Sequence, residues 1–344
     1  MSTDNDLPKH PAVMVVPRIR VQNANAISSA MTWGFPSITA FSGLMTALER
    51  RLGKDSGIEF YGVGVVCHAF EAQVTHAGFT RAFRLTRNPV RVDGTAAAIV
   101  EEGRVHLEVT LVFDVQLRSS YQDESERKKL IERVAHELAS MRMAGGSVMP
   151  PLPSASRGSG APFLELIPDV DDEKRKQFRR VARRCLPGFA LVSRDDLLQK
   201  RLQELRIADA QASLLDAWLD LSRWNTRAVE QTPKEGDDSP AVTWVTDARS
   251  GWLVPIPVGY SALSDLQLAG SVSGARDMET PFRFVEPVWS IGQWISPHRL
   301  KSLTDLVWAP DHNPKHPTEH GLYRCRNNFI ASLPNEPAVT AEDI

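Results

Sequence analysis

A strongly basic segment at residues 171–185 has the residue types and spacing to bind nucleic-acid phosphates. It starts with three acids, continues with cations, and carries the apolar side chains Phe178 and Val181. On a helix, four of its cations lie near one another at spacings of three, four and seven: Lys176, Arg180, Arg183 and Arg184. The alternative, a solvated helix, usually intersperses glutamates, whereas the acids here stand only at the start, where the helix dipole favours them. We therefore predict that these cations follow a phosphate backbone.

A second group of cations lies on an excursion between two expected strands, at residues 71–97. Its candidate RNA ligands are Arg81, Arg84, Arg87 and Asn88. The acids near it, Glu71 and Asp93, are too few to pair with all of these charges. A hairpin carrying arginines can clamp an RNA backbone, because binding residues often lie on loops of a rigid scaffold. The alternative is a solvated hairpin, and the scarcity of acids favours RNA binding.

Amide and hydroxyl side chains gather in a polar loop that follows the first expected strand. The RNA-binding candidates on this strand and loop are Arg18, Asn23, Asn25, Ser28 and Trp33. Amides read base edges, hydroxyls bind phosphate and sugar oxygens, and an exposed indole stacks on an unpaired base. The alternative is a loop whose polar groups bond their own backbone. For Phe35, next to the expected helix, we predict packing against that helix rather than stacking on RNA.

Three further arginines are RNA-binding candidates. Arg142 precedes Gly145 and Gly146, and a glycine turn lets a phosphate approach the backbone, although a glycine pair also ends helices. Arg276 and Arg283 lie in the string ARDMETPFRFVE. An amphipathic strand with a buried phenylalanine face is the alternative there. Both readings hold together if Arg283 contacts RNA and Phe284 lies in the core.

The nine histidines raise the question of catalysis. His312, His316 and His320 are four apart, but the prolines among them forbid a helix that would align them on a metal. His68 and His106 fall in expected strands. Each is a possible base of a metal-independent ribonuclease or, more simply, a core or edge histidine whose ring nitrogens have hydrogen-bond partners. The sequence has no NTPase or metallohydrolase motif. We therefore expect a protein that is not an enzyme and needs no cofactor or metal.

Composition limits the class of protein. The net charge of −2 and the pI near 6.5 exclude a uniformly basic nucleic-acid coat. No apolar run reaches the length of a membrane span, and the polar N-terminus lacks the apolar region of a signal peptide. Three widely spaced cysteines support neither a disulfide framework nor a zinc ribbon. We expect a cytoplasmic protein that does not contact membranes.

The elements that must position these residues follow the order βαββαβ. Strands are expected at residues 13–21, 58–69, 104–115 and 147–152, and helices at residues 38–52 and 123–142. In the first strand, Val13, Val15, Ile19 and Val21 are expected on one side. This pattern predicts an α+β fold: a ferredoxin-like (RRM-type, RAMP) domain at residues 1–152 with an inserted arginine-bearing hairpin. The rest of the chain is predicted to form an irregular helical and β-rich companion domain at residues 163–330 and a flexible tail at 331–344.

Long strings spread over the chain resemble a known family. They are IRVQNANAISSAMTWGFPS in the opening segment, VVCHAFEAQV at 65–74, LTRNP at 85–89, TAAAIVEEGRVHLEV at 95–109, MRMAGGSVMP at 141–150, LPGFALVSR at 186–194, GWLVPIPVGYSAL at 251–263, ARDMETPFRFVE at 275–286 and WISPHRL at 294–300. In these strings the chain resembles the Csy-two family, the Cas-five-type subunit of the type I-F CRISPR Cascade (Csy) surveillance complex, which acts in antiviral defence.

The resemblance implies a role that the residue patterns alone do not. It implies an RNA-binding structural subunit that caps the 5′ handle of crRNA. The subunit would form a heterodimer with the large subunit of the complex, contact the backbone subunit, and take part in recognition of foreign double-stranded DNA. It also implies that target DNA passes near the basic helix, so Lys176, Arg180, Arg183 and Arg184 are expected on DNA. The alternative function is a metal-independent endoribonuclease that processes CRISPR repeat RNA, as some Cas-five-type relatives do.

Overall fold

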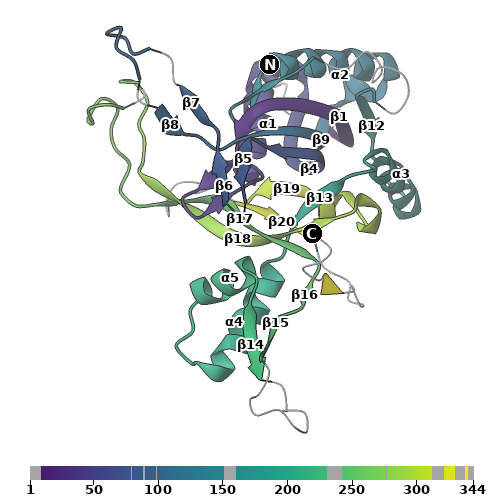
Figure 1. The fold of residues 1–344 in the computed structure, drawn as a ribbon. Helices are drawn as coiled ribbons and strands as arrows, with labels where there is room; N and C mark the ends of the chain where they lie inside the picture. The colour runs from purple at the N-terminus through teal and green to yellow at the C-terminus, as the bar shows by residue number, and fades with distance from the viewer. Residues whose placement is uncertain are drawn as a thin grey trace.

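A computed structural model gives the fold of the chain (Figure 1). It describes residues 9–78, 80–87, 90–97, 99–150, 160–230, 242–275, 277–311, 321–329 and 338–339. Most of the strands belong to one eleven-stranded sheet, in which every pairing is antiparallel. Six α-helices accompany the strands within these residues. The prediction of a mixed α/β fold is confirmed.

The N-terminal half contains the expected βαββαβ order. Its main elements are β1 (Lys9–Asn25), α1 (Ile38–Leu52), β4 (Ile58–Ala72), β9 (Arg104–Arg118), α2 (Glu124–Ala139) and β11 (Gly146–Val148). The strands lie in the order β11-β1-β9-β4. Hence β1 and β9, which are far apart in the sequence, are central neighbours. The fourth strand, β11, is short and pairs with β1 only at Val21 and Gln22. The start of β1 pairs instead with β12 (Phe163–Leu166).

Helices α1 and α2 cover one face of this sheet with apolar side chains. Ser37 caps α1 by accepting a hydrogen bond from the Thr39 amide, as its position before the apolar stripe predicts. The predicted stripe of α1 is buried in full: Phe41, Leu44, Met45, Leu48 and Leu52. In α2 the buried residues are Leu130, Ile131, Val134 and Leu138. The expected inner face of β9 joins the same core with Val105, Leu107, Val109, Leu111 and Phe113.

One expectation for β1 is wrong. Val13 and Val15 pack in the cluster with α3 (Asp171–Arg184), whereas Ile19 and Val21 pack in the cluster with α1 and α2. The cause is a break in register between Val16 and Ile19, where Arg18 has a φ of 54°. An extra residue at such a bulge moves the following side chains to the opposite face of the sheet.

The C-terminal half continues the same sheet. Its strands are β13 (Phe189–Ser193), β17 (Trp252–Ala262), β18 (Val285–Ile295), β19 (Val307–Pro310) and β20 (Leu322–Asn327). The pairings run β4-β13-β18-β17-β20-β19 and return from β19 to β4, which forms a closed circuit. Strand β4 allows this because β19 pairs with it at Val63 and Gly64, and β13 at Val66 and Cys67. Strands from both sides of the expected domain boundary therefore share one sheet.

The remaining elements extend from this sheet. A lobe consists of α4 (Asp195–Ala208), α5 (Leu214–Ser222) and the hairpin of β14 (Thr226–Glu230) with β15 (Val242–Thr246) (Figure 1). The excursion after β4 forms β5 (Val74–Ala77), β6 (Thr80–Phe83), β7 (Leu85–Arg87) and β8 (Ile99–Glu101). Short elements are β2 (Ile27–Ser29), β3 (Thr32–Trp33), β10 (Arg142–Met143), α6 (Leu303–Leu306), β16 (Arg249–Ser250) and β21 (Ala338–Val339).

The closed circuit depends on close backbone contact at Gly259. A β-carbon at this position would lie 2.0 Å from the Tyr323 carbonyl oxygen and 2.9 Å from the Arg324 α-carbon. Both atoms belong to the backbone of β20, so they cannot move aside as a side chain does. We expect Gly259→Ala to lower the free energy of unfolding by about 3 kcal/mol, measured by urea denaturation.

Gly43 of α1 provides the matched control for this glycine. A β-carbon there meets no atom within 4 Å. Alanine also restricts the unfolded chain more than glycine does, so Gly43→Ala should raise stability by roughly 0.5–1 kcal/mol. Equal denaturation midpoints for the two variants would contradict the close approach of β17 and β20.

Candidate nucleic-acid interface

Three of the predicted RNA ligands line one cavity at the start of α1. Asn25, Ser28 and Arg142 surround a space of about 480 Å³ together with Ser37, Thr39, Ala40, Gly145 and Tyr260. The residues come from the end of β1, from β2, from the N-terminus of α1, from the β10–β11 hairpin and from β17. Segments distant in sequence therefore meet at a polar hollow of the size of ligand pockets.

The β10–β11 hairpin forms the glycine-bearing wall of this cavity. Met143 pairs with Gly146, so Ala144 and Gly145 form a two-residue loop with φ angles of 48° and 77°. Both positive angles match the turn that joins twisted strands, and α2 has already ended at Ala139. The glycine pair is therefore a hairpin turn and not a helix cap. The Arg142 guanidinium donates to the Gly145 carbonyl oxygen at 3.3 Å, which fixes this arginine beside the turn.

The N-terminus of α1 forms the opposite wall. Backbone N–H groups of a first helical turn have no partner within the helix and favour anions. Ser37 caps one of them, since its hydroxyl oxygen accepts from the Thr39 amide at 3.2 Å. With Arg142 across the same cavity, the hollow has two features that attract a phosphate.

Asn25 fixes the loop that borders the cavity. Its side-chain amide donates to the Ile27 carbonyl oxygen at 2.7 Å, and its side-chain oxygen accepts from the Ile27 amide at 3.1 Å. Its own backbone amide donates to the Ala144 carbonyl oxygen at 2.8 Å, which joins the loop to the hairpin. The alternative reading of a loop that bonds its own backbone is therefore correct for this side chain. Asn25 still lines the cavity and keeps one amide hydrogen for another partner.

The two aromatic residues before α1 differ in their surroundings. Trp33 is 54% exposed, and its ring meets Phe83 of β6 edge to face with centroids 5.9 Å apart. It therefore lies where the arginine-bearing excursion joins the body of the protein. Phe35 packs between Phe41 and Trp294, at centroid distances of 5.6 and 4.9 Å. The prediction that Phe35 packs on the helix is confirmed, while Trp33 keeps an accessible ring.

The excursion forms an arm of paired short strands, with β7 and β8 projecting from the body (Figure 1). Arg81 is exposed and has no ion pair or side-chain hydrogen bond to any residue that the structure describes. Arg84 is also exposed and donates to the Gln73 side-chain oxygen at 3.1 Å. Arg87 belongs to β7, with its side chain outside the described part, and Asn88 lies outside the described residues.

Arg18 and Asn23 occupy the two register breaks of β1 rather than the cavity. Both have positive φ angles, 54° and 55°. Arg18 forms an ion pair with Glu108 at 2.7 Å, so its charge is already compensated. The Asn23 backbone amide donates to His106 Nδ1 at 3.1 Å, and the Asn23 side chain is exposed. The sequence did not predict that these two candidates lie at bulges of β1.

Of the two arginines in the string at 275–286, Arg283 does not line this cavity. Arg276 lies outside the described residues. Arg283 is half-buried, and a β-carbon at Gly321 would lie 2.7 Å from its Nη1. Phe284 is 52% exposed and contacts Phe282 edge to face. The prediction of a buried Phe284 is wrong because this segment crosses between β17 and β18 outside the closed circuit of strands.

Helix α3 is basic on its exposed side, as predicted, and buries Phe178 and Val181. Two of its four phosphate candidates have structural contacts: Arg180 pairs with Glu165 at 3.1 Å, and the Arg184 guanidinium lies 4.3 Å from the centre of the Phe163 ring. Lys176 and Arg183 are exposed and have no acidic partner among the described residues. The structure therefore places all four on one helix. Lys176 and Arg183 are more available for phosphate contacts than Arg180 and Arg184.

Comparison with known proteins finds a match that spans both halves of this fold. The family described as CRISPR-associated protein (Cas_Csy2) matches residues 14–325. This chain belongs to the Csy2 family. It is 47% identical over 321 residues to "CRISPR-associated protein Csy2" of Pseudomonas aeruginosa (strain UCBPP-PA14), a match that covers 91% of this chain and 94% of that protein. The resemblance read from the sequence is confirmed.

The histidines of this Csy2-family chain have structural contacts. His68 Nδ1 lies 2.6 Å from the Pro187 carbonyl oxygen, and Nε2 lies 2.7 Å from the Thr110 hydroxyl. A carbonyl only accepts, so Nδ1 carries the hydrogen, and burial lowers the pKa of the ring. His106 accepts the Asn23 amide. His312, His316 and His320 lie outside the described residues. Both ring nitrogens of His68 are therefore engaged, which favours the structural reading.

The remaining groups of the Csy2-family chain give little chemistry. Cys67, Cys185 and Cys325 are free, and burial raises the pKa of Cys67 and of Cys185 to about 12, so both are neutral thiols. Across the residues with assigned positions, no three His, Cys, Asp or Glu side chains form a group that could hold a metal. Within the same part of the chain, no helix is long and apolar enough to cross a membrane.

Sequence reasoning missed the partners that complete the cavity. Tyr260 of β17 lines it and lies 3.2 Å from the Thr39 hydroxyl, and Ser37 bonds the Pro257 carbonyl oxygen at 3.1 Å. Both contacts join residues more than two hundred positions apart. The one signal in the sequence was the string GWLVPIPVGYSAL, which carries Tyr260 and belongs to the family resemblance.

Proposed function

We propose that this chain is the RNA-binding structural subunit of a type I-F CRISPR surveillance complex and caps the 5′ handle of crRNA. Its Csy2-family membership supports this role. The structural observation that carries it is the meeting of Asn25, Ser28 and Arg142 around one polar cavity at the N-terminus of α1. The sequence alone predicts all three as RNA ligands.

We further infer that the N-terminal half is a ferredoxin-like domain of the RRM or RAMP type. The strand order β11-β1-β9-β4 corresponds to fourth, first, third and second strand of a βαββαβ unit. Helices α1 and α2 lie on one face of that sheet. The order supports the inference because each βαβ connection then spans one intervening strand, as in this fold.

The chemistry of the cavity suits a single-stranded RNA end. A phosphate would accept hydrogen bonds from the Arg142 guanidinium and the first amides of α1. The Ser28 hydroxyl and the free amide hydrogen of Asn25 would contact a sugar or a base edge. The exposed Trp33 ring would stack on an unpaired base next to the arm. The arginines of the arm would hold the RNA backbone as it leaves the cavity.

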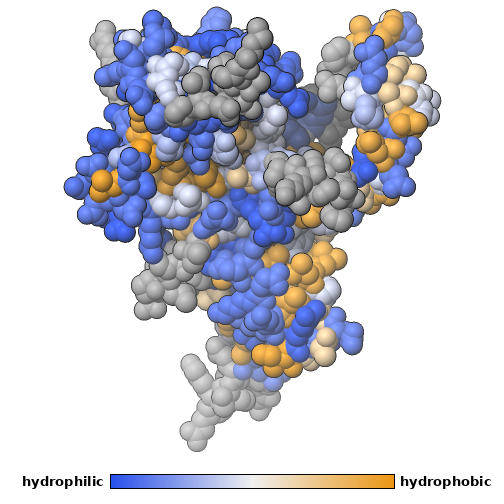
Figure 2. All heavy atoms as spheres, turned by 180° about the vertical axis from the view of Figure 1, so that it is seen from behind, coloured by the Kyte–Doolittle hydropathy of each residue, from blue (hydrophilic) through white to orange (hydrophobic). Residues whose placement is uncertain are grey.

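The partners belong to the same proposal. The lobe of α4, α5, β14 and β15 exposes six large apolar side chains: Ile207, Leu214, Leu215, Leu219, Trp224 and Trp244. Figure 2 shows hydrophobic residues on the surface at that end of the molecule. Such patches are typical of subunit contacts. We assign this lobe to the large subunit, α3 to target double-stranded DNA, and a further contact to the backbone subunit. We propose no catalytic step, since His68 and His106 are engaged in structural hydrogen bonds.

Charge reversal at Arg142 tests the proposed function. We expect Arg142→Glu to reduce RNA binding by the assembled complex by about 10- to 100-fold, since a charged hydrogen bond contributes roughly 1.5–3 kcal/mol. The measurement is the amount of crRNA that copurifies with the complex at rising salt.

Arg50 is the matched control, because it is an exposed arginine at the opposite end of α1. Arg50→Glu should leave the RNA content unchanged. Equal RNA loss in both variants, or none in either, would contradict the assignment of the cavity. Cleavage of repeat RNA by the purified chain would overturn the proposal that it is not an enzyme.

A further inference from the structure

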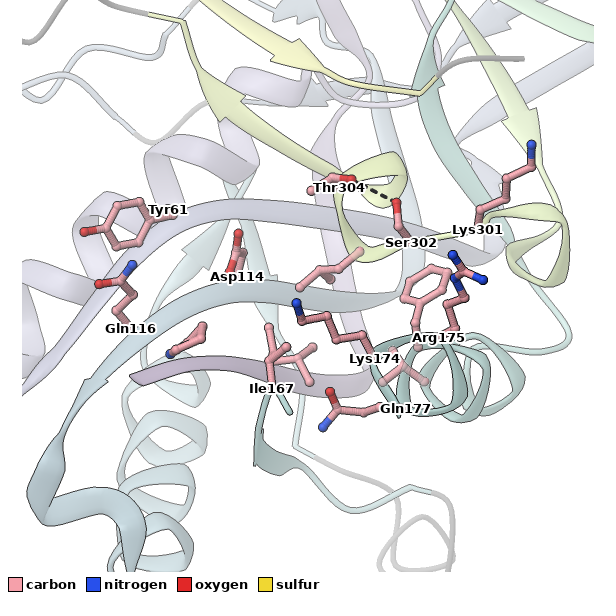
Figure 3. Close-up of a pocket in the computed structure, with 15 residues that line it drawn as sticks. Tyr61, Asp114, Gln116, Ile167, Lys174, Arg175, Gln177, Lys301, Ser302 and Thr304 are labelled. Atoms are coloured by element: carbon pink, nitrogen blue, oxygen red, sulfur yellow. Dashed lines mark hydrogen bonds between the residues drawn. The ribbon is translucent and has the colours of Figure 1, made fainter. Parts of the chain in front are cut away.

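A second cavity lies on the other face of the sheet, away from the proposed RNA site (Figure 3). It has a volume of about 380 Å³ and lies between β1, β9, α3 and the segment that leads into α6. Its walls include the apolar side chains Val13, Ile167, Phe178, Val181 and Leu303. A pocket of this size with apolar walls accepts a flat organic group of the size of a nucleobase.

Asp114 and Gln116 are the polar side chains on the β9 side of this cavity, and Asp114 carries the negative charge (Figure 3). Among the described residues it has no hydrogen bond and no ion pair, and burial is the cause that raises its pKa. Asp114 is half-buried, and a carboxylate that is partly withdrawn from water without hydrogen-bond donors costs free energy. The cavity therefore presents two acceptor oxygens that an entering group with N–H donors would satisfy.

Three cations stand around the same cavity. Lys174 and Arg175 come from α3, and Lys301 precedes α6 (Figure 3). The acidic partners of the α3 pair are Asp171 and Asp172, whose side chains are 82% and 79% exposed, so these ion pairs are weak. The site thus combines an inner acceptor with outer positive charge. This combination excludes a simple cation and favours a ligand with donors at one end and an anion at the other.

We propose that this cavity binds a guanine nucleotide, with the base edge on Asp114 and the phosphate beside Lys174, whose ammonium points into the cavity (Figure 3). The two adjacent N–H groups of guanine, N1–H and N2–H, match both oxygens of one carboxylate. Adenine and cytosine offer only one donor group next to an acceptor, which faces a carboxylate unfavourably. The apolar walls cover the faces of the base. The nucleotide is either free or an unpaired residue of a polynucleotide.

Asp114→Asn in the full-length chain gives the sharpest test. Asparagine accepts one hydrogen bond and donates one, so it matches xanthine, which has N1–H beside the O2 acceptor. Calorimetric titration should show that the native chain binds guanosine monophosphate about 5- to 150-fold more tightly than xanthosine monophosphate, the range for one bidentate pair. The variant should reverse that order. No binding of guanosine monophosphate at millimolar concentration, or equal affinities in the native chain, would overturn the proposal.

Two additional measurements keep the proposal falsifiable if the asparagine variant unfolds. Lys174→Ala should weaken binding of guanosine monophosphate but not of guanosine, whereas equal effects on both would contradict a phosphate at this lysine. Affinity should also fall as the pH drops through the raised pKa of Asp114, because the protonated acid no longer accepts both N–H groups. A pH-independent affinity would contradict the base edge on Asp114.

The source of the nucleotide is decided by competition. The probes are guanosine monophosphate and a short oligothymidylate that carries one central guanosine. If the oligonucleotide binds more tightly, the cavity takes an unpaired residue of a polynucleotide; if the mononucleotide binds more tightly, the ligand is a free nucleotide. If guanosine monophosphate and the oligonucleotide do not displace each other, they bind at different places, and the proposal of a single site is overturned.

Discussion

Charge reversal of the arm should release crRNA from the complex while leaving the fold almost unchanged. In the variant Arg81→Glu, Arg84→Glu, Arg87→Glu, we expect bound RNA to fall by at least about 100-fold, because several phosphate contacts of roughly 1.5–3 kcal/mol each are replaced by repulsion. Arg81 has no side-chain partner among the described residues, and the Arg84 guanidinium donates to the side-chain oxygen of Gln73. The RNA content and the melting temperature are measured on the same preparation.

The lysine version of the same triple variant is the matched control. Lysine keeps the charge at all three positions but cannot form the planar double hydrogen bond of arginine. Most of the RNA should therefore remain bound. A normal RNA content in the glutamate variant together with a lowered melting temperature would show that these arginines stabilise the fold instead.

Neutralising the exposed face of α3 should have the second large effect, on target DNA. Each phosphate contact on duplex DNA contributes about −0.9 to the slope of log affinity against log salt. Replacing Lys176, Arg180, Arg183 and Arg184 with glutamine should therefore flatten this slope by up to about three units. Most of the change should already appear in the Lys176→Gln, Arg183→Gln double variant, because Arg180 and Arg184 have structural contacts with Glu165 and Phe163.

Exposed lysines of α2 provide the control for the α3 experiment. Lys128 and Lys129 lie on the outer side of that helix. Their replacement by glutamine should leave the salt dependence unchanged. An unchanged slope in the α3 variant would mean a solvated helix face, and loss of crRNA from that variant would assign α3 to the handle site.

Local patterns predicted the helices and strands of the βαββαβ unit but not which strands pair. Ser37 before an apolar stripe marked the start of α1, and the alternation in β9 identified its buried face. The face of the first half of β1 was predicted wrongly, because one residue with a positive φ angle, Arg18, shifts the register. Alternation in the sequence does not indicate a bulge until the partner strand is known.

Three of the twelve predicted RNA-binding residues line the cavity at the start of α1 within the described part of the chain, and the shape of the cavity was not predicted. Asn25, Ser28 and Arg142 were selected because amides, hydroxyls and guanidinium groups suit RNA, and they do line one cavity. Tyr260 and the second cavity at Asp114 were missed because each depends on contacts between distant segments. Arg18 was selected by type alone, and its ion pair with Glu108 depends on the pairing of β1 with β9.

Crosslinking of the assembled complex to its own crRNA, mapped by residue, tests the central claim most directly. The 5′ handle should crosslink to the cavity and to the base of the arm, at Ser28, Trp33 and Arg142 and along the segment with Arg81 and Arg84. Target DNA should crosslink to α3. Handle crosslinks confined to α3 or to the lobe of α4 and α5, with none around the cavity at the start of α1, would contradict the account.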